Sequence, residues 1–364
     1  MGLKTHARIL IILCAAILVA PAGCAYRSCQ LDDISAFKKF NVNPSSKIKI
    51  GFSFATIQEE RWQRDIDLFV ARAEKLGAEV LVQSANGDEN LQNSQGENLI
   101  TQGVDVLVVI AQNGETAAAI VDAAHKENVK VIAYDRLITN CDLDYYISFD
   151  NVKVGEIQAE TIVKKYPKGN YVLIGGSPTD NNAKLVREGQ MNILQPYIDK
   201  GDIKIVADQW ADGWKPEVAL KHVENALTAN NNDVAAVITS NDGCAGAAVQ
   251  ALAEQKLAGK VGVPGQDADL AACQRVVEGT QTVTVYKPIK AIATKAAEMA
   301  VAIAKGESIG EATQKINNGK IDVPSVLLTP VAVDASNMYD IIIKDGWQKL
   351  EDVYKNVPKD QWPK

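Results

Sequence analysis

The chain has 364 residues, of which 47% are hydrophobic and 23% charged, and its formal net charge is −7. This composition is that of a globular protein, and the length suits two domains. The acidic balance argues against a nucleic-acid-binding protein, which would carry a basic patch.

The N-terminus predicts an exported protein. Lys4 and Arg8 precede an unbroken apolar run over residues 9–19. This run is long enough for the core of a signal peptide but shorter than the ~20 residues that a membrane-spanning helix needs. We therefore expect a signal peptide over residues 1–23, and a mature protein located in the periplasm or on the outer face of the cell membrane.

The sequence PAGC at residues 21–24 resembles the lipobox of bacterial lipoproteins, in which the cysteine becomes the acylated N-terminus after cleavage. We expect a lipid on Cys24 and a polar tether over residues 24–46. Ordinary cleavage after Ala22, which would release a free protein, is the alternative.

Four cysteines remain once Cys14, inside the signal peptide, and Cys24 are set aside. They are Cys29, Cys141, Cys244 and Cys273. In an oxidising compartment these cysteines could pair, and Cys244 with Cys273 is the best candidate pair. Buried free thiols are the alternative. None of the four shows C-x-x-C spacing, so we expect neither a metal nor a redox centre.

Short runs rich in β-branched residues recur from Lys47 onward and predict ten strands. They cover residues 48–54, 79–83, 104–110, 129–134, 145–149, 171–174, 203–207, 235–239, 260–263 and 282–286. Most are separated by segments with helical periodicity, of which Glu60–Leu76 and Ala291–Ala304 are the clearest. Apolar strands that alternate with helices form parallel sheets covered on both faces. Ten strands are too many for one core, so we expect two doubly wound α/β lobes, with an eight-fold barrel as the alternative.

Polar and aromatic side chains follow almost every predicted strand. In open parallel sheets ligands bind outside the carboxyl ends of the strands, so these residues form the candidate site. They are Glu60–Trp62, Asp135 and Arg136, Gly175–Ser177, Asp180–Asn182, Trp210–Trp214, Ser240–Asp242, Gly265–Asp267 and Lys287.

The chemistry of this set suits an uncharged polyol. A sugar hydroxyl both donates and accepts a hydrogen bond, so carboxylates can accept its proton while Arg, Lys and Asn donate to its oxygen. Such charge-assisted bonds contribute roughly 1.5–3 kcal/mol each. The apolar C–H face of a sugar ring can pack on a flat tryptophan. The alternative for Asp180, Ser240, Asp242 and Asp269 is that they cap the helices that follow them.

Motifs for catalysis and metal binding are missing from the sequence. His125 and His222 fall in predicted helices far apart in the chain and are expected on the surface. Neither H-E-x-x-H, G-x-S-x-G, a P-loop nor G-x-G-x-x-G occurs. We therefore expect a protein that is not an enzyme and uses no metal or cofactor.

Several stretches of the sequence resemble one known family. They include ERW at 60–62, AYDR at 133–136, GGSPTDNNAKL at 175–185, DQWADGW at 208–214, GQDADL at 265–270 and GTQTVTVYKP at 279–288. These stretches are similar to periplasmic D-xylose-binding proteins, and the resemblance runs from Lys47 to about Gly346.

The resemblance implies a type I periplasmic-binding fold, in which two lobes are joined by a three-segment hinge and close on a sugar between them. The lobes would be residues 47–152 with 287–330, and residues 153–286 with 331–364. It also implies the sugar-binding residues: Arg61, Trp62, Asp135, Arg136, Asn182, Trp214, Asn241, Asp267 and Lys287. Trp62 and Trp214 would enclose the ring. The protein would be a monomer that delivers its sugar, D-xylose foremost, to the membrane permease subunits of an ABC importer.

Other functions remain open at this point. The same fold could bind glucose, galactose, ribose or arabinose, and the protein could also act as a sugar sensor for a membrane kinase or a chemoreceptor. A transcription regulator of this fold would need an N-terminal helix-turn-helix, where this chain has a predicted signal peptide. An exported sugar-processing enzyme is the last alternative.

Overall fold

The computed structural model of the protein describes residues 47–363. The predicted signal peptide, the lipid anchor at Cys24, the tether and Cys29 lie outside the described residues. Within residues 47–363 no helix is both long enough and apolar enough to cross a membrane.

The first lobe is built on a seven-stranded sheet whose order is β11-β12-β5-β4-β3-β1-β2. Its strands are β1 (Lys49–Phe54), β2 (Glu79–Ser84), β3 (Val106–Ile110), β4 (Lys130–Tyr134), β5 (Tyr145–Phe149), β11 (Gln314–Asn317) and β12 (Asp322–Leu328). All neighbours pair in parallel except the β11–β12 hairpin. Because the sheet is open at both edges, the fold is not a barrel.

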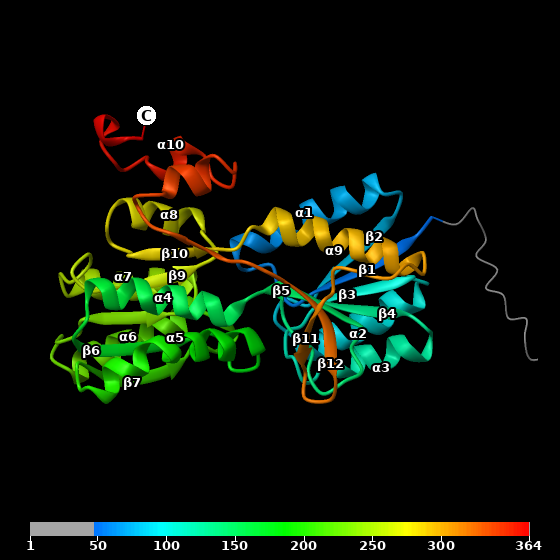
Figure 1. The fold of residues 1–364 in the computed structure, drawn as a ribbon, viewed down its shortest axis with the longest axis horizontal. Helices are drawn as coiled ribbons and strands as arrows, with labels where there is room; N and C mark the ends of the chain where they lie inside the picture. Colours follow the sequence, from blue (N-terminus) through cyan, green and yellow to red (C-terminus); the bar gives the residue numbers. More distant parts are fainter. Residues whose placement is uncertain (1–46, 364) are drawn as a thin grey trace, which may run out of the picture. The chain divides into compact units, whose positions relative to one another are not determined.

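Helices cover both faces of this sheet (Figure 1). They are α1 (Glu60–Lys75), α2 (Glu89–Thr101), α3 (Ala118–Lys126) and α9 (Ile289–Ala304). On one face α1 and α9 pack in a core that contains Phe52, Phe69 and Ile292. On the other face α2 and α3 pack over Leu107 and Val131. The strands are therefore apolar on both sides, as the sequence pattern predicted.

The second lobe contains two three-stranded sheets, β7-β6-β8 and β13-β10-β9. The strands are β6 (Gly169–Gly175), β7 (Ile203–Trp210), β8 (Ala236–Thr239), β9 (Pro264–Gln266), β10 (Val283–Tyr286) and β13 (Val331–Val333). A single parallel bridge between Ala236 and Gly262 links the two sheets. The helices are α4 (Asn151–Lys165), α5 (Asn181–Asp199), α6 (Pro216–Ala229), α7 (Asp242–Glu254), α8 (Leu270–Val277) and α10 (Leu350–Val353), with short turns η1 (Asp212–Trp214), η2 (Tyr339–Ile343) and η3 (Lys359–Gln361).

The chain passes between the lobes three times, from β5 to α4, from β10 to α9 and from β12 to β13. Two of these segments are joined directly, because the backbone N–H of Asp150 donates to the carbonyl of Leu328 at 3.0 Å. The predicted fold class, two doubly wound lobes joined by three segments, is confirmed.

The ninth predicted strand was wrong in position. Residues 260–263 contribute only the bridge at Gly262, and the paired strand begins at Pro264. The strands β11 and β12 were not predicted. Pro324 lies inside β12, and proline normally argues against a strand that has neighbours on both sides.

The C-terminal segment packs onto the second lobe, beside α8 and β10 (Figure 1). The indole of Trp347 donates to the carbonyl of Ala268 at 2.8 Å, and its ring lies 5.8 Å from that of Tyr286. Farther along, the ring of Trp362 lies 6.2 Å from that of Tyr354. Two tryptophans thus attach a tail that has little regular structure.

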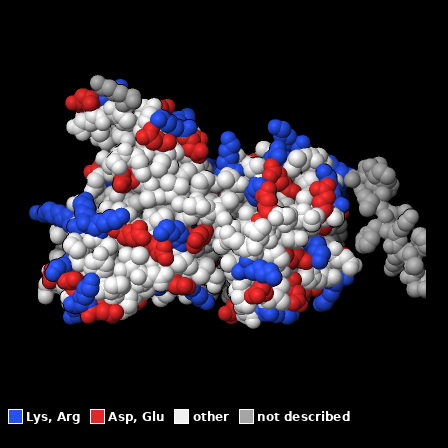
Figure 2. All heavy atoms as spheres, in the orientation of Figure 1, with Lys and Arg blue, Asp and Glu red and all other residues white. Residues whose placement is uncertain are grey.

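Over the face shown in Figure 2, Lys and Arg side chains are scattered among Asp and Glu.

Helices α4 and α5 approach so closely that glycine is required at their contact. A Cβ atom on Gly155 would lie 2.0 Å from the carbonyl oxygen of Val186, and one on Gly189 would lie 1.9 Å from that of Val152. Neither contact is sterically possible. The two glycines therefore set the distance between these helices.

We expect Gly189→Ala to lower the free energy of unfolding by about 3 kcal/mol, because the methyl group must push two helix backbones apart. Gly310→Ala is the control, since no atom lies within 4 Å of the added Cβ and the φ angle is not positive. This control should change stability by less than about 0.5 kcal/mol. Urea unfolding measures both, and equal midpoints would contradict the packing argument.

Candidate functional site

One pocket is lined by polar and aromatic side chains that follow the strands. It holds about 310 Å³ of empty space and is lined from both lobes. Its lining residues are Glu59, Arg61, Trp62, Asp135, Arg136, Asp180, Asn182, Trp214, Asn241, Gln266, Asp267 and Lys287. All nine residues that the sequence assigned to ligand binding are among them. Glu59, Asp180 and Gln266 were not in that set.

The first lobe supplies five of the lining residues from two places. Glu59 directly precedes α1, Arg61 and Trp62 lie in its first turn, and Asp135 and Arg136 directly follow β4. Asp135 has a φ angle of 61°, which is a left-handed conformation that non-glycine residues rarely adopt. The hydroxyl groups of Tyr146 and Ser148 donate to its carbonyl, at 3.0 and 2.7 Å, and hold it there. Strained backbone of this kind concentrates at functional sites.

The second lobe contributes residues at strand ends and helix starts. Trp214 ends η1, and Asp267 follows β9 with a φ angle of 97°. A Cβ atom on Gly176 would lie 2.2 Å from the ring of Trp214, so only glycine permits the ring to lie against this backbone. Lys287 lies on the segment from β10 to α9 and is therefore in the hinge.

A buried cluster of charges forms the floor of the pocket. The guanidinium of Arg61, which is 1% exposed, lies 3.1 Å from Asp65, 2.9 Å from Asp135 and 3.6 Å from Asp267. Lys287 contacts Asp267 at 3.0 Å. Because Asp267 belongs to the second lobe, Arg61 is a cation shared across the cleft.

The charges in this cluster control the protonation of Asp135. Burial alone would raise the pKa of Asp135, but Arg61, Lys287 and Arg136 outweigh it and hold this pKa below its ordinary value. The carboxylate is therefore ionised at neutral pH. An ionised carboxylate only accepts hydrogen bonds, which makes it an acceptor for hydroxyl groups.

Several buried oxygen atoms in the pocket have no hydrogen-bond partner among the described residues. They are Asp135 Oδ2, Asp267 Oδ1 and Gln266 Oε1. The two carboxylate oxygens are paired with cations, Asp135 Oδ2 with Arg61 at 2.9 Å and Asp267 Oδ1 with Lys287 at 3.0 Å, and a carboxylate oxygen can accept more than one hydrogen bond. A buried acceptor without a donor, such as Gln266 Oε1, costs about 1–3 kcal/mol. The pocket therefore favours a ligand that brings hydroxyl donors.

The capping alternative holds for only part of the set. Asp180 caps α5, because its side chain accepts from the backbone N–H of Asn182 at 2.9 Å, yet it also contacts Arg136 at 3.0 Å. Asn241, assigned to the ligand, caps α7 as well. Asp269 stands at the cap position of α8 without a side-chain cap bond. The capping prediction was wrong for Ser240, whose hydroxyl donates to a strand carbonyl, and for Asp242, which lies inside α7.

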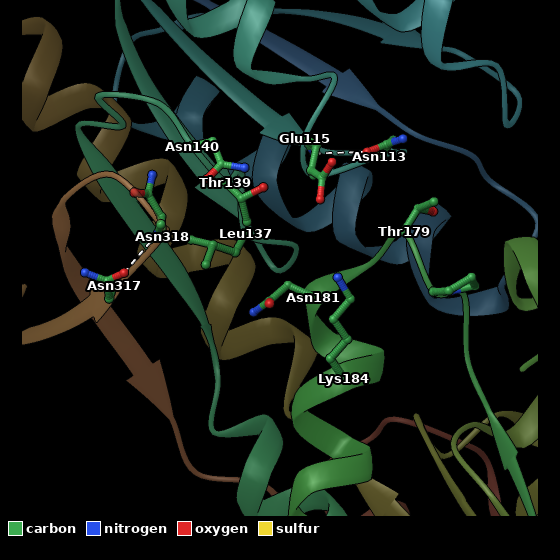
Figure 3. A pocket seen from close by; sticks show the side chains of 13 residues that line it. Asn113, Glu115, Leu137, Thr139, Asn140, Thr179, Asn181, Lys184, Asn317 and Asn318 are labelled. Atoms are coloured by element: carbon green, nitrogen blue, oxygen red, sulfur yellow. Dashed lines mark hydrogen bonds between the residues drawn. The ribbon is translucent and has the colours of Figure 1, made fainter. Parts of the chain in front are cut away.

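A second, larger hollow lies beside this pocket and holds none of the nine residues. It has about 820 Å³ of empty space and is open to solvent. Figure 3 shows Glu115 of the first lobe and Lys184 of α5 pointing into it from opposite sides. Asparagines such as Asn318 surround it, but the amide of Asn318 is already engaged by Ile138 and Cys141.

The cysteines and histidines of residues 47–363 lie away from any cluster of predicted metal ligands. Cys141, Cys244 and Cys273 are free and buried, so the buried-thiol alternative is correct and Cys244 does not pair with Cys273. Across these residues no three His, Cys, Asp or Glu side chains are grouped as metal ligands. His125 contacts Asp144 at 2.8 Å on the outer side of α3.

The sequence and the fold match a known family. Residues 50–308 fit the family model described as periplasmic binding protein domain. This chain belongs to that family. It is 55% identical over 329 residues to the D-xylose-binding periplasmic protein of Haemophilus influenzae, which covers 90% of this chain and 99% of the relative. It is 56% identical over 305 residues to the D-xylose-binding periplasmic protein of Escherichia coli, covering 84% of this chain and 92% of the relative.

A solved structure of the family has a similar fold. It is a carbohydrate transporter solute-binding protein from Chloroflexus aurantiacus in complex with D-glucose, with a TM-score of 0.79 and 31% identity. The match covers 85% of this chain and 98% of that one. The resemblance that the sequence motifs indicated is thus confirmed.

Asp242 is a buried carboxylate of the second lobe that lies in contact with Asp269. Asp242 accepts hydrogen bonds from Gln281 at 2.8 Å, from Thr284 at 2.7 Å and from the backbone N–H of Asp269 at 3.1 Å. Burial, with Asp267 nearby, raises the pKa of Asp242 to about 7, although Arg275 and the bond from Thr284 oppose the shift. The folded protein therefore keeps a proton that the unfolded chain loses near pH 3.8.

We expect this proton to make stability fall as the pH rises. Between about pH 4 and pH 7 the folded state binds the proton and the unfolded state does not, so raising the pH favours unfolding. The loss from about pH 5 to pH 8 should be roughly 2–3 kcal/mol. Asp242→Asn should flatten this part of the profile, as urea unfolding at both pH values would measure. Identical pH dependence in the variant and the parent protein would contradict the assignment.

Proposed function

We propose that this protein captures a single monosaccharide, D-xylose foremost, outside the cytoplasm and delivers it to an ABC importer. The two xylose-binding relatives, which align over nearly their whole length, support this proposal. The observation that carries it is the pocket itself, whose lining combines buried carboxylates that can accept further hydrogen bonds, cationic donors and two tryptophans. These groups suit a ligand whose polar atoms are mostly hydroxyl groups.

The size and charge of the pocket favour a small neutral ligand. The pocket is small, with about 310 Å³ of empty space. The carboxylates of Asp135 and Asp267 already balance Arg61 and Lys287, so an added charge would have no counter-ion. A neutral pentose avoids that cost, because moving an unpaired charge into a protein interior is strongly unfavourable.

The lobes are proposed to act as a clamp. We take residues 47–152 with 287–330 as one lobe and residues 153–286 with 331–364 as the other, with the three crossing segments as the hinge. The contact between Arg61 and Asp267 spans the cleft, so it belongs to the closed state. Hinge closure of this kind is a common response to ligand binding. The closed form would be the one that permease subunits recognise.

The remaining assignments follow from this role. The protein would work as a monomer and would be attached to the membrane by a lipid on Cys24. It would release its sugar without modifying it chemically. A second candidate function keeps the same site. The ligand would then be glucose, galactose, ribose or arabinose, and the protein would act as a sugar sensor for a membrane kinase or chemoreceptor. The D-glucose complex of the Chloroflexus aurantiacus protein supports testing this alternative.

Isothermal titration against xylose, ribose, arabinose, glucose and galactose tests the proposed ligand. We expect micromolar or tighter binding for xylose and much weaker binding for the other four. Tighter binding of another sugar would overturn the choice of xylose, and no heat with any of the five would overturn the proposed function.

Asp135→Ala should weaken xylose binding by about 2–3 kcal/mol, since the sugar loses an acceptor and Arg61 loses a counter-ion. That is roughly 30- to 150-fold in affinity. Asp122→Ala is the matched control, because Asp122 is exposed on α3, away from the pocket. A change below twofold in Asp135→Ala, with the control unchanged, would remove Asp135 from the binding site.

A further inference from the structure

Each pocket tryptophan is held by a carboxylate through its indole N–H. Trp62 Nε1 donates to Glu59 Oε2 at 2.7 Å, and Trp214 Nε1 donates to Asp180 Oδ2 at 3.1 Å. An indole ring has one donor and no acceptor, so this bond selects one orientation of the ring. Each pair lies within a single lobe, which means that both rings can be oriented before the lobes meet.

Arg136 lies between the two carboxylates. Its guanidinium is 3.6 Å from Glu59 and 3.0 Å from Asp180, and its central carbon is 5.5 Å from the ring centroid of Trp62. Since Arg136 follows β4 in the first lobe and Asp180 begins α5 in the second, the contact between them crosses the cleft. The two tryptophan–carboxylate pairs are thus joined through one cation.

The side chain of Glu59 does not cap the helix that it precedes. Glu59 occupies the N-cap position of α1, where a side-chain oxygen normally accepts from the helix backbone, yet it makes no cap hydrogen bond. It turns instead toward the indole of Trp62 and lines the pocket. Helix α1 therefore has no side-chain cap, and the indole N–H of Trp62 has a fixed acceptor instead.

We propose that Glu59 is a positioning residue of the sugar site. It holds the ring of Trp62, and through Arg136 it keeps that ring opposite Trp214, which Asp180 holds in the other lobe. This inference rests on the proposed function, in which the two rings enclose the sugar. Its consequence is specific: affinity depends on a glutamate whose main contact is with a ring and not with the ligand.

The test compares two substitutions at one position. Glu59→Ala removes the acceptor for Trp62, whereas Glu59→Gln keeps an acceptor oxygen and removes only the charge. Glu97→Gln is the control for the loss of a glutamate charge, because Glu97 is exposed on α2. We expect Glu59→Ala to weaken xylose binding about tenfold and Glu59→Gln to stay within about threefold of the parent protein.

An NMR measurement without sugar separates this inference from the proposed function. The indole ¹H–¹⁵N signal of Trp62, assigned by its loss in Trp62→Phe, reports the hydrogen bond directly. We expect Glu59→Ala to shift this signal and to speed its exchange with water, and Glu59→Gln to restore it.

Two results would overturn the proposal. One is an indole signal of Trp62 that is unchanged in Glu59→Ala, and the other is a loss of affinity in Glu59→Gln as large as in Glu59→Ala. If the parent protein binds none of the five sugars, the proposed function fails, while the indole signal still decides whether Glu59 holds Trp62.

Discussion

The buried guanidinium of Arg61 is the feature on which the site depends. A lone cation at this depth would be too costly, so the chain surrounds it with the carboxylates of Asp65, Asp135 and Asp267. The carboxylates come from the same helix, from the end of β4 and from the opposite lobe. Because removing one partner of a buried ion pair typically costs about 3–5 kcal/mol, each carboxylate is constrained in place. The part of the pocket that Asp135 and Asp267 line is therefore rigid.

The same cluster explains why the ligand should be neutral and rich in hydroxyl groups. The charges nearly balance one another, while Asp135 Oδ2 and Asp267 Oδ1 keep unused acceptor capacity. Hydroxyl groups satisfy these oxygens without adding charge. The two tryptophan rings that line the pocket offer apolar surface of the kind that a sugar ring needs, and the indole N–H of each ring donates to a carboxylate, Glu59 or Asp180.

The sequence alone led to much of this site because of one topological rule. Residues after parallel strands gather at one end of a sheet, and Asp135, Asp267 and Lys287 were found on that basis. Glu59 was missed because it precedes a helix and looks like a solvated cap. Asp180 was interpreted as a cap, and its bonds to Arg136 and Trp214 depend on how the lobes fold. The shift of the ninth strand to Pro264 has a similar cause, since pairing with β10 and not local propensity sets its start.

A crystal structure of the protein grown with D-xylose tests the central claim most directly, because residues 47–363 form more than one hollow between the lobes. The account predicts one xylose ring between Trp62 and Trp214, with its hydroxyl groups bonded to Asp135 and Asp267. Xylose in the larger hollow beside Glu115 and Lys184, with the tryptophan pocket empty, would contradict it.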